Sequence, residues 1–374
     1  MNESLTRVRV AGFRSLRDVT VEFGPRTLLI GPNGSGKSNL LSVLQMVPLM
    51  RTQSLARFVG ERGGASAILH YGASKTREIE IEITFNSGSN DSTYAARLGY
   101  AAGDTLLYLD ESVSFGGEGS ASPQPTTLGA GHSESILSDR AKDPRTPVVR
   151  DLNGLLSRMS FFHFHDTSPT SPLRQNAHQS DDRYLRSDGS NLAAFLYRLC
   201  RGDDDGARSS WKLIQGTVRR IAPFIKELAP ALVNPGHPQS STRLFWVDER
   251  DHRFDVHDLS DGTLRAIALI TALGQPSTSV PRFIAIDEPE LGLHPAALSL
   301  VASLVRSVSS RCQVLLSTQS SALIDEFDPS EVVVVEQRDG ESKLRRLDAE
   351  ELAGWLDEYT LSELYEKNVF GGRP

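Results

Sequence analysis

The first part of the chain alternates hydrophobic and polar positions in the way that half-buried strands do. Residues 8–10 and 19–23 predict two short strands joined through the turn Gly12–Ser15. Residues 76–85 alternate again, and residues 94–115 continue the pattern through two more strands. Because alternation of this kind buries one face of each strand, these segments predict an antiparallel sheet.

A different pattern surrounds this predicted sheet. Residues 27–30 are continuously apolar and end in a glycine-rich turn, which is typical of a buried central strand, and residues 39–50 follow with helical spacing. Residues 243–256 predict a hairpin. From residue 280 onward the pattern alternates between strand and helix, so the chain is predicted to have an α/β fold.

The middle of the chain has weaker patterns. Residues 116–147 are rich in Gly, Ser, Pro and Thr with few apolar positions, which predicts a long mobile loop or a partly disordered insertion. Residues 159–166 predict a strand. Helices are predicted over 189–200 and 208–228, with a break at the polar segment Gly202–Gly206.

Composition excludes several classes of protein. The 374 residues are 39% hydrophobic and 23% charged with a net charge of −7, so nucleic acid would have to contact a local basic patch or a partner. Cys200 and Cys312 stand far apart without metal-ligand spacing, which argues against a disulfide framework or a zinc site. The sequence has no signal segment and no run of 18 apolar residues, so we expect a cytoplasmic protein with no membrane partner.

The strongest motif is the segment Gly31–Ser38, which fits the phosphate-loop pattern G-x-x-x-x-G-K-[ST] between a predicted strand and a predicted helix. Its backbone N–H groups and the helix N-terminus would bind the phosphates of ATP. Lys37 would reach the β- and γ-phosphates, and the Ser38 hydroxyl would bind Mg²⁺. The candidate nucleotide-binding residues here are Asn33, Gly34, Ser35, Gly36, Lys37, Ser38 and Asn39.

A second motif is the apolar run at residues 283–286, which ends in two adjacent acids. Asp287 would join Ser38 in holding Mg²⁺, because open α/β sheets place ligands at the carboxyl ends of their strands. Glu288 would polarise the attacking water as a general base. Two acids at the end of a strand are common and usually structural. Together with a phosphate loop in the same chain, they indicate a functional role.

A third motif is Leu259–Thr263, which precedes an apolar helix at residues 264–273. Ser260 offers a hydroxyl and Gly262 a close backbone approach, while the helix N-terminus favours negative charge. Taken alone, the same residues predict an ordinary helix N-cap.

Polar residues after two other strands are harder to assign. Gln319 follows an apolar strand at residues 314–316 and could hydrogen-bond a γ-phosphate. Gln175 and Gln179 are weak candidates for a second glutamine contact. His163 and His165 alternate along one strand, and we expect them to be structural.

These motifs, in this order, resemble those of predicted AAA-family, ABC-type ATPases related to the RecF, SMC and OLD groups, most of all compact bacterial members without a coiled coil. The resemblance implies an α/β P-loop NTPase fold: an ABC-type ATPase head with an antiparallel β-subdomain and a helical insertion. It also implies that Arg14 contacts phosphate. In that class, residues placed like Ser260 and Gly262 contact the γ-phosphate bound to the opposite protomer, and Gln319 stands where a switch histidine is usual.

The family pattern implies one ATPase head over residues 1–374. Its sections would be a phosphate-loop lobe at 1–85, a β and helical insertion at 86–240, and a lobe at 241–374 with the signature, acidic-strand and switch motifs. OLD-type proteins carry a Toprim nuclease domain after the ATPase. We expect none here, because the sequence ends soon after the last motif.

The resulting functional hypothesis is an ATPase that dimerises on ATP and drives a DNA-associated or phage-defence assembly. Its expected partners are a second copy of itself, a separate nuclease or effector protein, and DNA. The alternative is an ATP-sensing interaction scaffold with little turnover, because a glutamine such as Gln319 cannot carry a proton at neutral pH. A role as the ATPase of a membrane transporter fits less well.

Overall fold

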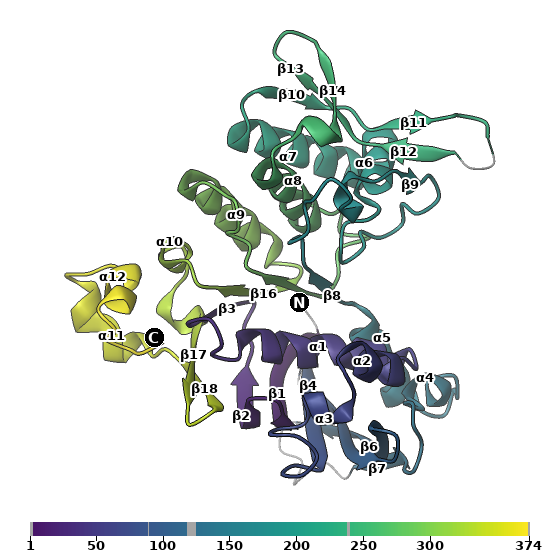
Figure 1. Ribbon diagram of the computed structural model, residues 1–374, viewed down its shortest axis with the longest axis vertical. Helices are drawn as coiled ribbons and strands as arrows, with labels where there is room; N and C mark the ends of the chain where they lie inside the picture. Colours follow the sequence, from purple (N-terminus) through teal and green to yellow (C-terminus); the bar gives the residue numbers. More distant parts are fainter. Residues whose placement is uncertain (1–2, 89, 118–124, 238–239, 373–374) are drawn as a thin grey trace. The chain divides into compact units, whose positions relative to one another are not determined.

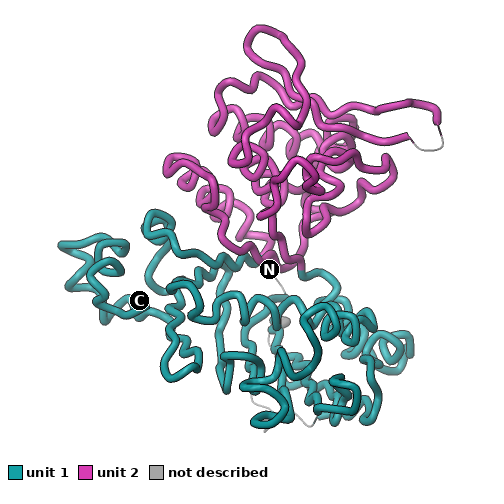
Figure 2. Tube along the Cα trace, in the orientation of Figure 1, with its two compact units in different colours: residues 1–159, 313–374 teal, residues 160–312 magenta. Residues whose placement is uncertain are grey.

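The computed structural model describes residues 3–88, 90–117, 125–237 and 240–372. The chain divides into two compact units (Figure 2). Unit 1 combines Met1–Met159 with Gln313–Pro374, and unit 2 is Ser160–Cys312. The phosphate-loop motif therefore lies in unit 1, and the signature and acidic-strand motifs lie in unit 2.

The β-subdomain of unit 1 is an antiparallel sheet with the strand order β2-β1-β4-β5-β6-β7 (Figure 1). The predicted hairpin at the start of the chain is confirmed, and the alternating side chains Ile79, Ile81 and Ile83 are all buried. The strands are β1 (Ser4–Phe13), β2 (Leu16–Glu22), β4 (Glu78–Ser87), β5 (Asn90–Ala101), β6 (Thr105–Gly117) and β7 (Thr126–Gly129).

The prediction of a long loop over residues 116–147 is wrong for the described part of that segment. Strand β7 pairs with β6, and a short helix, α4 (Leu137–Arg140), follows. The cause is one buried acid: Glu111 accepts hydrogen bonds from Ser135 Oγ at 2.5 Å and from Ile136 N–H at 3.0 Å. Such anchoring of a polar segment by a distant carboxylate leaves little trace in local sequence. Residues 118–124 lie outside the described residues.

A second sheet in unit 1 carries the strand order β18-β17-β3-β16. Strand β3 (Arg26–Ile30) is the predicted buried strand, and both β16 (Gln313–Thr318) and β17 (Val332–Arg338) run parallel to it. Strand β18 (Glu341–Arg346) pairs antiparallel with β17. The carboxyl ends of three parallel strands therefore meet at one edge, where α/β folds bind ligands.

Helices complete unit 1. The first of them, α1 (Lys37–Arg51), begins immediately after the phosphate loop as predicted. Helix α10 packs against α12 near the C-terminal end of the chain (Figure 1). The remaining helices of this unit are α2 (Leu55–Glu61), α3 (Ala65–Ile68), α5 (Pro147–Ser157), α10 (Ser321–Ile324), α11 (Ala349–Leu356) and α12 (Leu361–Glu366), with the 3-10 turn η3 (Pro329–Glu331).

Unit 2 contains four longer helices and short strands. Helices α6 (Leu192–Arg201) and α7 (Asp205–Ile221) form the helical insertion, and α8 (Asp261–Leu273) and α9 (Pro295–Val308) carry the later motifs. Strand β15 (Phe283–Asp287) is the predicted acidic strand. The other elements are β8 (Met159–Phe162), η1 (Pro172–Arg174), β9 (Ala177–His178), β10 (Ile225–Leu228), β11 (Ala231–Val233), β12 (Ser241–Arg243), β13 (Phe245–Asp248), β14 (Arg253–Asp255) and η2 (Val256–Asp258).

Two predicted elements of unit 2 end earlier than expected. Helix α7 stops at Ile221 instead of residue 228, because Pro223 lies just beyond and disfavours helical backbone at the residue before it. Strand β8 stops at Phe162, so residues 163–166 are not strand. The predicted hairpin at 243–256 is confirmed as β13 and β14.

Neither Cys200 nor Cys312 is part of a disulfide. Burial raises the pKa of the Cys312 thiol to about 12, so it is un-ionised at neutral pH. Across the described ranges, no helix has the length and apolar character needed to cross a membrane.

Candidate functional site: a phosphate loop and a signature–acid turn

The phosphate loop connects the end of β3 to the start of α1. Lys37 is the first residue of α1 and its side chain is buried. Its ammonium Nζ donates to the main-chain oxygens of Gly31 at 2.6 Å and Pro32 at 3.0 Å. The loop therefore curls around its own lysine, and the cation is held where a bound phosphate would meet it.

Gly36 shows why this loop needs glycine. Its φ angle is +110°, a left-handed conformation that side chains rarely adopt. An added Cβ would also overlap the Ser342 hydroxyl. Any substitution here would distort the loop at the point where helix α1 begins.

A hydrogen-bond network joins the loop to three other segments of unit 1. The Arg14 guanidinium donates to Asn39 Oδ1 at 3.4 Å, and the Asn39 amide donates to Ser15 Oγ at 2.7 Å. Ser15 shares a hydrogen bond with Ser342, whose hydroxyl donates to the main-chain oxygen of Ser35 at 2.7 Å. The structure thus brings together the predicted residues Arg14, Ser35 and Asn39.

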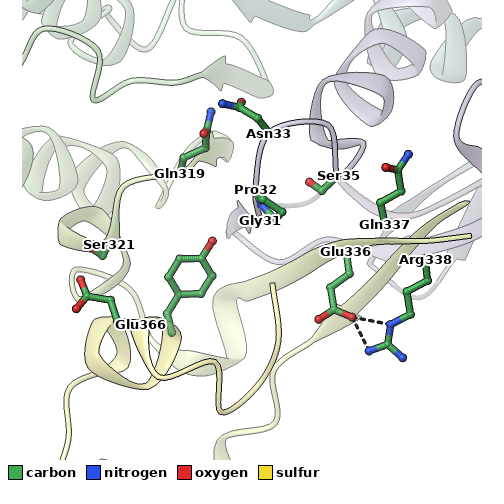
Figure 3. Close-up of a pocket in the computed structure, with 11 residues that line it drawn as sticks. Gly31, Pro32, Asn33, Ser35, Gln319, Ser321, Glu336, Gln337, Arg338 and Glu366 are labelled. Carbon is green, nitrogen blue, oxygen red and sulfur yellow. Dashed lines mark hydrogen bonds and ion pairs between the residues drawn. The ribbon is translucent and has the colours of Figure 1, made fainter. Parts of the chain in front are cut away.

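A cavity of about 710 Å³ opens beside the phosphate loop (Figure 3). That volume lies within the range of small-molecule sites. Asn33 and Gln319 lie on the same side of it in this view, and Glu336 is paired with Arg338 at 2.7 Å. The cavity is lined by Gly31, Pro32, Asn33, Ser35, Gln319, Ser321, Glu336, Gln337, Arg338, Tyr365 and Glu366.

Six of these eleven lining residues were missed in the sequence. Glu336–Arg338 reach the cavity because β17 pairs with β3 in parallel, and Tyr365 and Glu366 come from α12. Nothing near these residues in the sequence signals a site. Only the pairing of strands roughly 300 residues apart could have found them, and that pairing has no local signature.

The residues present fit a phosphate-bearing ligand. Ser35 Oγ is buried and has no hydrogen-bond partner among the described residues, so the loop holds a polar atom suited to a ligand. The site also has the features of an anion site: a lysine, a tight glycine turn and the N-terminus of a long helix. In the described part of the chain no three His, Cys, Asp or Glu side chains gather into a metal site.

In unit 2, the segment Leu259–Thr263, called the signature segment here, forms the start of helix α8. Ser260 is the N-cap, and its hydroxyl accepts the Thr263 N–H at 3.3 Å. The next residue, Asp261, pairs with Arg174 at 2.9 Å; the Arg174 side chain is buried and also donates to the Leu259 carbonyl. Ser260 therefore does act as an ordinary helix N-cap, as the sequence also allowed. It is exposed to solvent at the positive end of the helix dipole.

Gly262 lies against the loop that follows the acidic strand. An added Cβ on Gly262 would overlap the main-chain oxygen of Gly292, and Gly292 itself has φ of +74°. Two backbones approach this closely only where both residues lack a side chain. The start of α8 and the loop after Glu288 are consequently in direct backbone contact.

The acidic turn is strained. Strand β15 ends at Asp287, and Glu288 adopts φ of +47°, in the left-handed region. A non-glycine residue there costs about 1 to 3 kcal/mol, and such residues cluster at functional sites. His294 ends this loop as the N-cap of α9, its Nδ1 accepting the Ala296 N–H at 3.2 Å.

The predicted site residues divide between the two units. Arg14, the phosphate loop, Asn39 and Gln319 belong to unit 1. Ser260, Gly262, Asp287 and Glu288 belong to unit 2, as do Gln175 and Gln179, which are exposed. Within each unit the predicted residues lie near one another.

Fold and loop define the class: a mixed α/β P-loop ATPase with an ABC-type head and an antiparallel β-subdomain. A family model described as "AAA domain, putative AbiEii toxin, Type IV TA system" (AAA_21) matches residues 26–325. The chain belongs to this family, and membership implies ATP binding.

Two curated relatives support the predicted kinship. The chain is 23% identical over 340 residues to an OLD nuclease of Thermus scotoductus, a match that covers 86% of this chain and 60% of the nuclease. It is 35% identical over 80 residues to the DNA replication and repair protein RecF of Parasynechococcus marenigrum, covering 21% of this chain and 22% of RecF. The chain thus spans less than two thirds of the length of these relatives.

Solved structures agree on the fold. An Smc head bound to the C-terminal winged-helix domain of ScpA matches with a TM-score of 0.63 at 17% identity, covering 93% of this chain and 99% of that one. An Smc head from Pyrococcus furiosus with an extended coiled coil, bound to the C-terminal domain of ScpA, matches at 0.58 and 14% identity, covering 95% and 99%. The predicted relationship to the SMC, RecF and OLD groups is confirmed.

Proposed function

We propose that this protein binds ATP with Mg²⁺, dimerises on it and hydrolyses it to drive a DNA-associated or phage-defence assembly. The observation that carries the proposal is the phosphate loop itself. Its lysine is buried within the loop, and a cavity of about 710 Å³ adjoins it. Membership in a P-loop ATPase family supports the same chemistry.

Each motif has a separate task in this proposal. Lys37 and the loop N–H groups bind the phosphates, and Arg14 adds a planar cation suited to a phosphate oxygen. Ser38 and Asp287 would hold Mg²⁺, which would neutralise phosphate charge. Glu288 accepts the proton of the attacking water. The strained backbone at Glu288 supports this role, because strain is retained where function requires it.

The signature residues would act across a dimer. Ser260 is exposed at the N-terminus of α8, a 13-residue helix whose positive end favours a phosphate. Two such surfaces facing one another about a two-fold axis would form two equivalent sites. In each site, Gly36, Lys37 and Ser38 come from one protomer, and Ser260 and Gly262 from the other.

The proposed DNA or defence role rests on the relatives. One is named a nuclease and the other a DNA replication and repair protein. The net charge of −7 argues against broad electrostatic attraction to DNA, so we propose that a separate nuclease or effector protein supplies the final activity.

The test is ATP hydrolysis by the purified full chain, with and without double-stranded DNA, beside Lys37→Ala. Turnover that DNA raises and the substitution abolishes supports a DNA-linked ATPase. Turnover that Lys37→Ala leaves intact would exclude this site as its source.

One observation favours a second function, an ATP-sensing scaffold. Gln319 lines the cavity in the switch position, and its amide cannot take up a proton. ATP occupancy alone would then control partner binding. Turnover above about 1 s⁻¹, within the usual range of enzymes, would count against this alternative.

A further inference from the structure

The strained acidic turn of unit 2 is held by a histidine that no motif includes. His165 Nε2 lies 3.2 Å from the main-chain oxygen of Asp287 and donates to it. That oxygen belongs to the peptide group that joins Asp287 to Glu288. Because Glu288 has φ of +47°, the orientation of this peptide group decides where the Glu288 carboxylate points.

Helix α8, which begins within the signature segment and is called the signature helix below, also bonds His165. Arg265, on α8 five residues after the N-cap Ser260, donates from Nε to the Phe164 carbonyl at 3.0 Å and from Nη2 to the His165 carbonyl at 2.6 Å. A guanidinium with two donors in a fixed plane suits two neighbouring carbonyls, which an ammonium cannot reproduce. Arg265 and His165 therefore connect α8 to the acidic turn by three hydrogen bonds.

A second connection runs beside the first. Gly262, near the start of α8, contacts the backbone of Gly292, and a Cβ on Gly292 would lie 3.1 Å from Arg265 Nη1. The acidic turn is thus in contact with the signature helix on both sides: through His165 before Glu288, and through Gly292 after it.

We propose that His165 and Arg265 are positioning residues that fix the Glu288 turn and couple its conformation to the signature helix. This inference rests on the proposed function, in which Glu288 is the general base. When Ser260 and Gly262 contact the nucleotide of a second protomer, the resulting shift of α8 would change the conformation of the Glu288 turn through Arg265. Hydrolysis would follow correct dimer formation for this reason.

The kinetic test compares His165→Ala, His165→Gln and the matched control His163→Ala in the full chain. His163 is also exposed and lies two residues earlier, and its main-chain N–H bonds Ser187. Loss of one hydrogen bond to the turn predicts a kcat about tenfold lower for His165→Ala, with KM for MgATP changed less than about twofold. His165→Gln retains an N–H donor and restores most of the turnover, and His163→Ala behaves as wild type.

The coupling test adds Arg265→Lys, alone and with His165→Ala. If the two residues act through one connection, the double variant loses little more kcat than the worse single variant. Independent losses that multiply would overturn the coupling. A wild-type kcat in His165→Ala, or a loss that Gln does not restore, would overturn the positioning role.

Hydrogen exchange without nucleotide separates this inference from the proposed function. The amides of Leu291 and Leu293 donate to Glu288 and Glu290 within the turn. His165→Ala should speed exchange in peptides over residues 287–293, whereas His163→Ala and His165→Gln should not. Unchanged exchange overturns the inference. If His165→Ala speeds exchange but the protein has no ATPase activity, the positioning inference stands and the proposed function is wrong.

Discussion

The phosphate loop of unit 1 and the signature–acid turn of unit 2 are held in different ways. The Ser342 hydroxyl donates to the phosphate loop itself. Arg14 and Asn39 extend this contact into a side-chain network that reaches Ser342 through Ser15. In the acidic turn most contacts end on main-chain atoms: a glycine lies against a glycine, and His165 and Arg265 donate to carbonyls. The first arrangement suits a fixed ligand cradle. The second suits a turn whose backbone responds to the helix beside it.

The largest effect should come from the centre of the phosphate loop. Lys37→Ala removes the cation that the loop surrounds, and we expect ATP affinity to fall by about 100-fold or more, since charge-assisted bonds to phosphate contribute most there. Isothermal titration calorimetry measures this. Lys343→Ala, an exposed lysine on β18, is the control and should bind normally. Equal affinity for both variants would contradict the assigned site.

Gly262→Ala should sharpen the comparison by damaging only the turn. The added methyl overlaps the Gly292 carbonyl, so the backbones must separate. We expect turnover to fall by about tenfold or more while ATP affinity of the monomer stays near wild type, because within one protomer the phosphate loop is in the other unit. Gly216→Ala, where an added Cβ meets nothing within 4 Å, is the matched control. Parallel loss of binding and turnover would show that the two regions are not separable in this way.

The buried carboxylate of unit 1 offers a stability test. Glu111→Ala removes the acceptor for Tyr94 Oη at 2.7 Å, for Ser135 and for the Ile136 N–H. Leaving these donors unpaired should lower the free energy of unfolding by about 3 kcal/mol and release the segment around β7. Urea unfolding measures the loss, with Glu82→Ala on the exposed sheet face as the comparison. A loss below about 1 kcal/mol would mean that Glu111 does not anchor the segment.

The smallest effect is expected on that exposed face. Arg9 pairs with Asp18 at 3.1 Å, with Glu80 at 3.0 Å and with Glu82 at 3.4 Å, all of them partly exposed. Arg9→Ala should cost less than about 1 kcal/mol, and less still at high salt, because water screens such pairs. ATP turnover should not change. A loss as large as that of Glu111→Ala would contradict the ranking.

Sequence alone located the parts of the candidate site that are local. Gly31–Ser38, Asp287 and Glu288 are short motifs at strand ends, and strands β3 and β15 were predicted because buried runs are continuous. The residues that were missed depend on distant pairing. Ser342 on β18 donates to the phosphate loop, and Glu336 on β17 lines the cavity beside it.

Two further features show the same limit. The segment around β7 appeared structureless because its anchor, Glu111, bonds Ser135 and Ile136, which lie 24 and 25 residues later. His165 was predicted to be structural, and its hydrogen bond agrees with that prediction. Its partner could not be predicted, because a main-chain oxygen has no residue type to recognise. Periodicity and motifs record neighbours in sequence, and these contacts are neighbours only in space.

The central claim is that ATP closes a dimer which Glu288 then opens by hydrolysis. The most direct measurement is size-exclusion chromatography with light scattering on Glu288→Gln in MgATP, beside its turnover. The account predicts turnover at least about 100-fold below wild type and a stable ATP-bound dimer that Lys37→Ala cannot form. A Glu288→Gln protein that stays monomeric in MgATP, or that hydrolyses ATP at the wild-type rate, would contradict it.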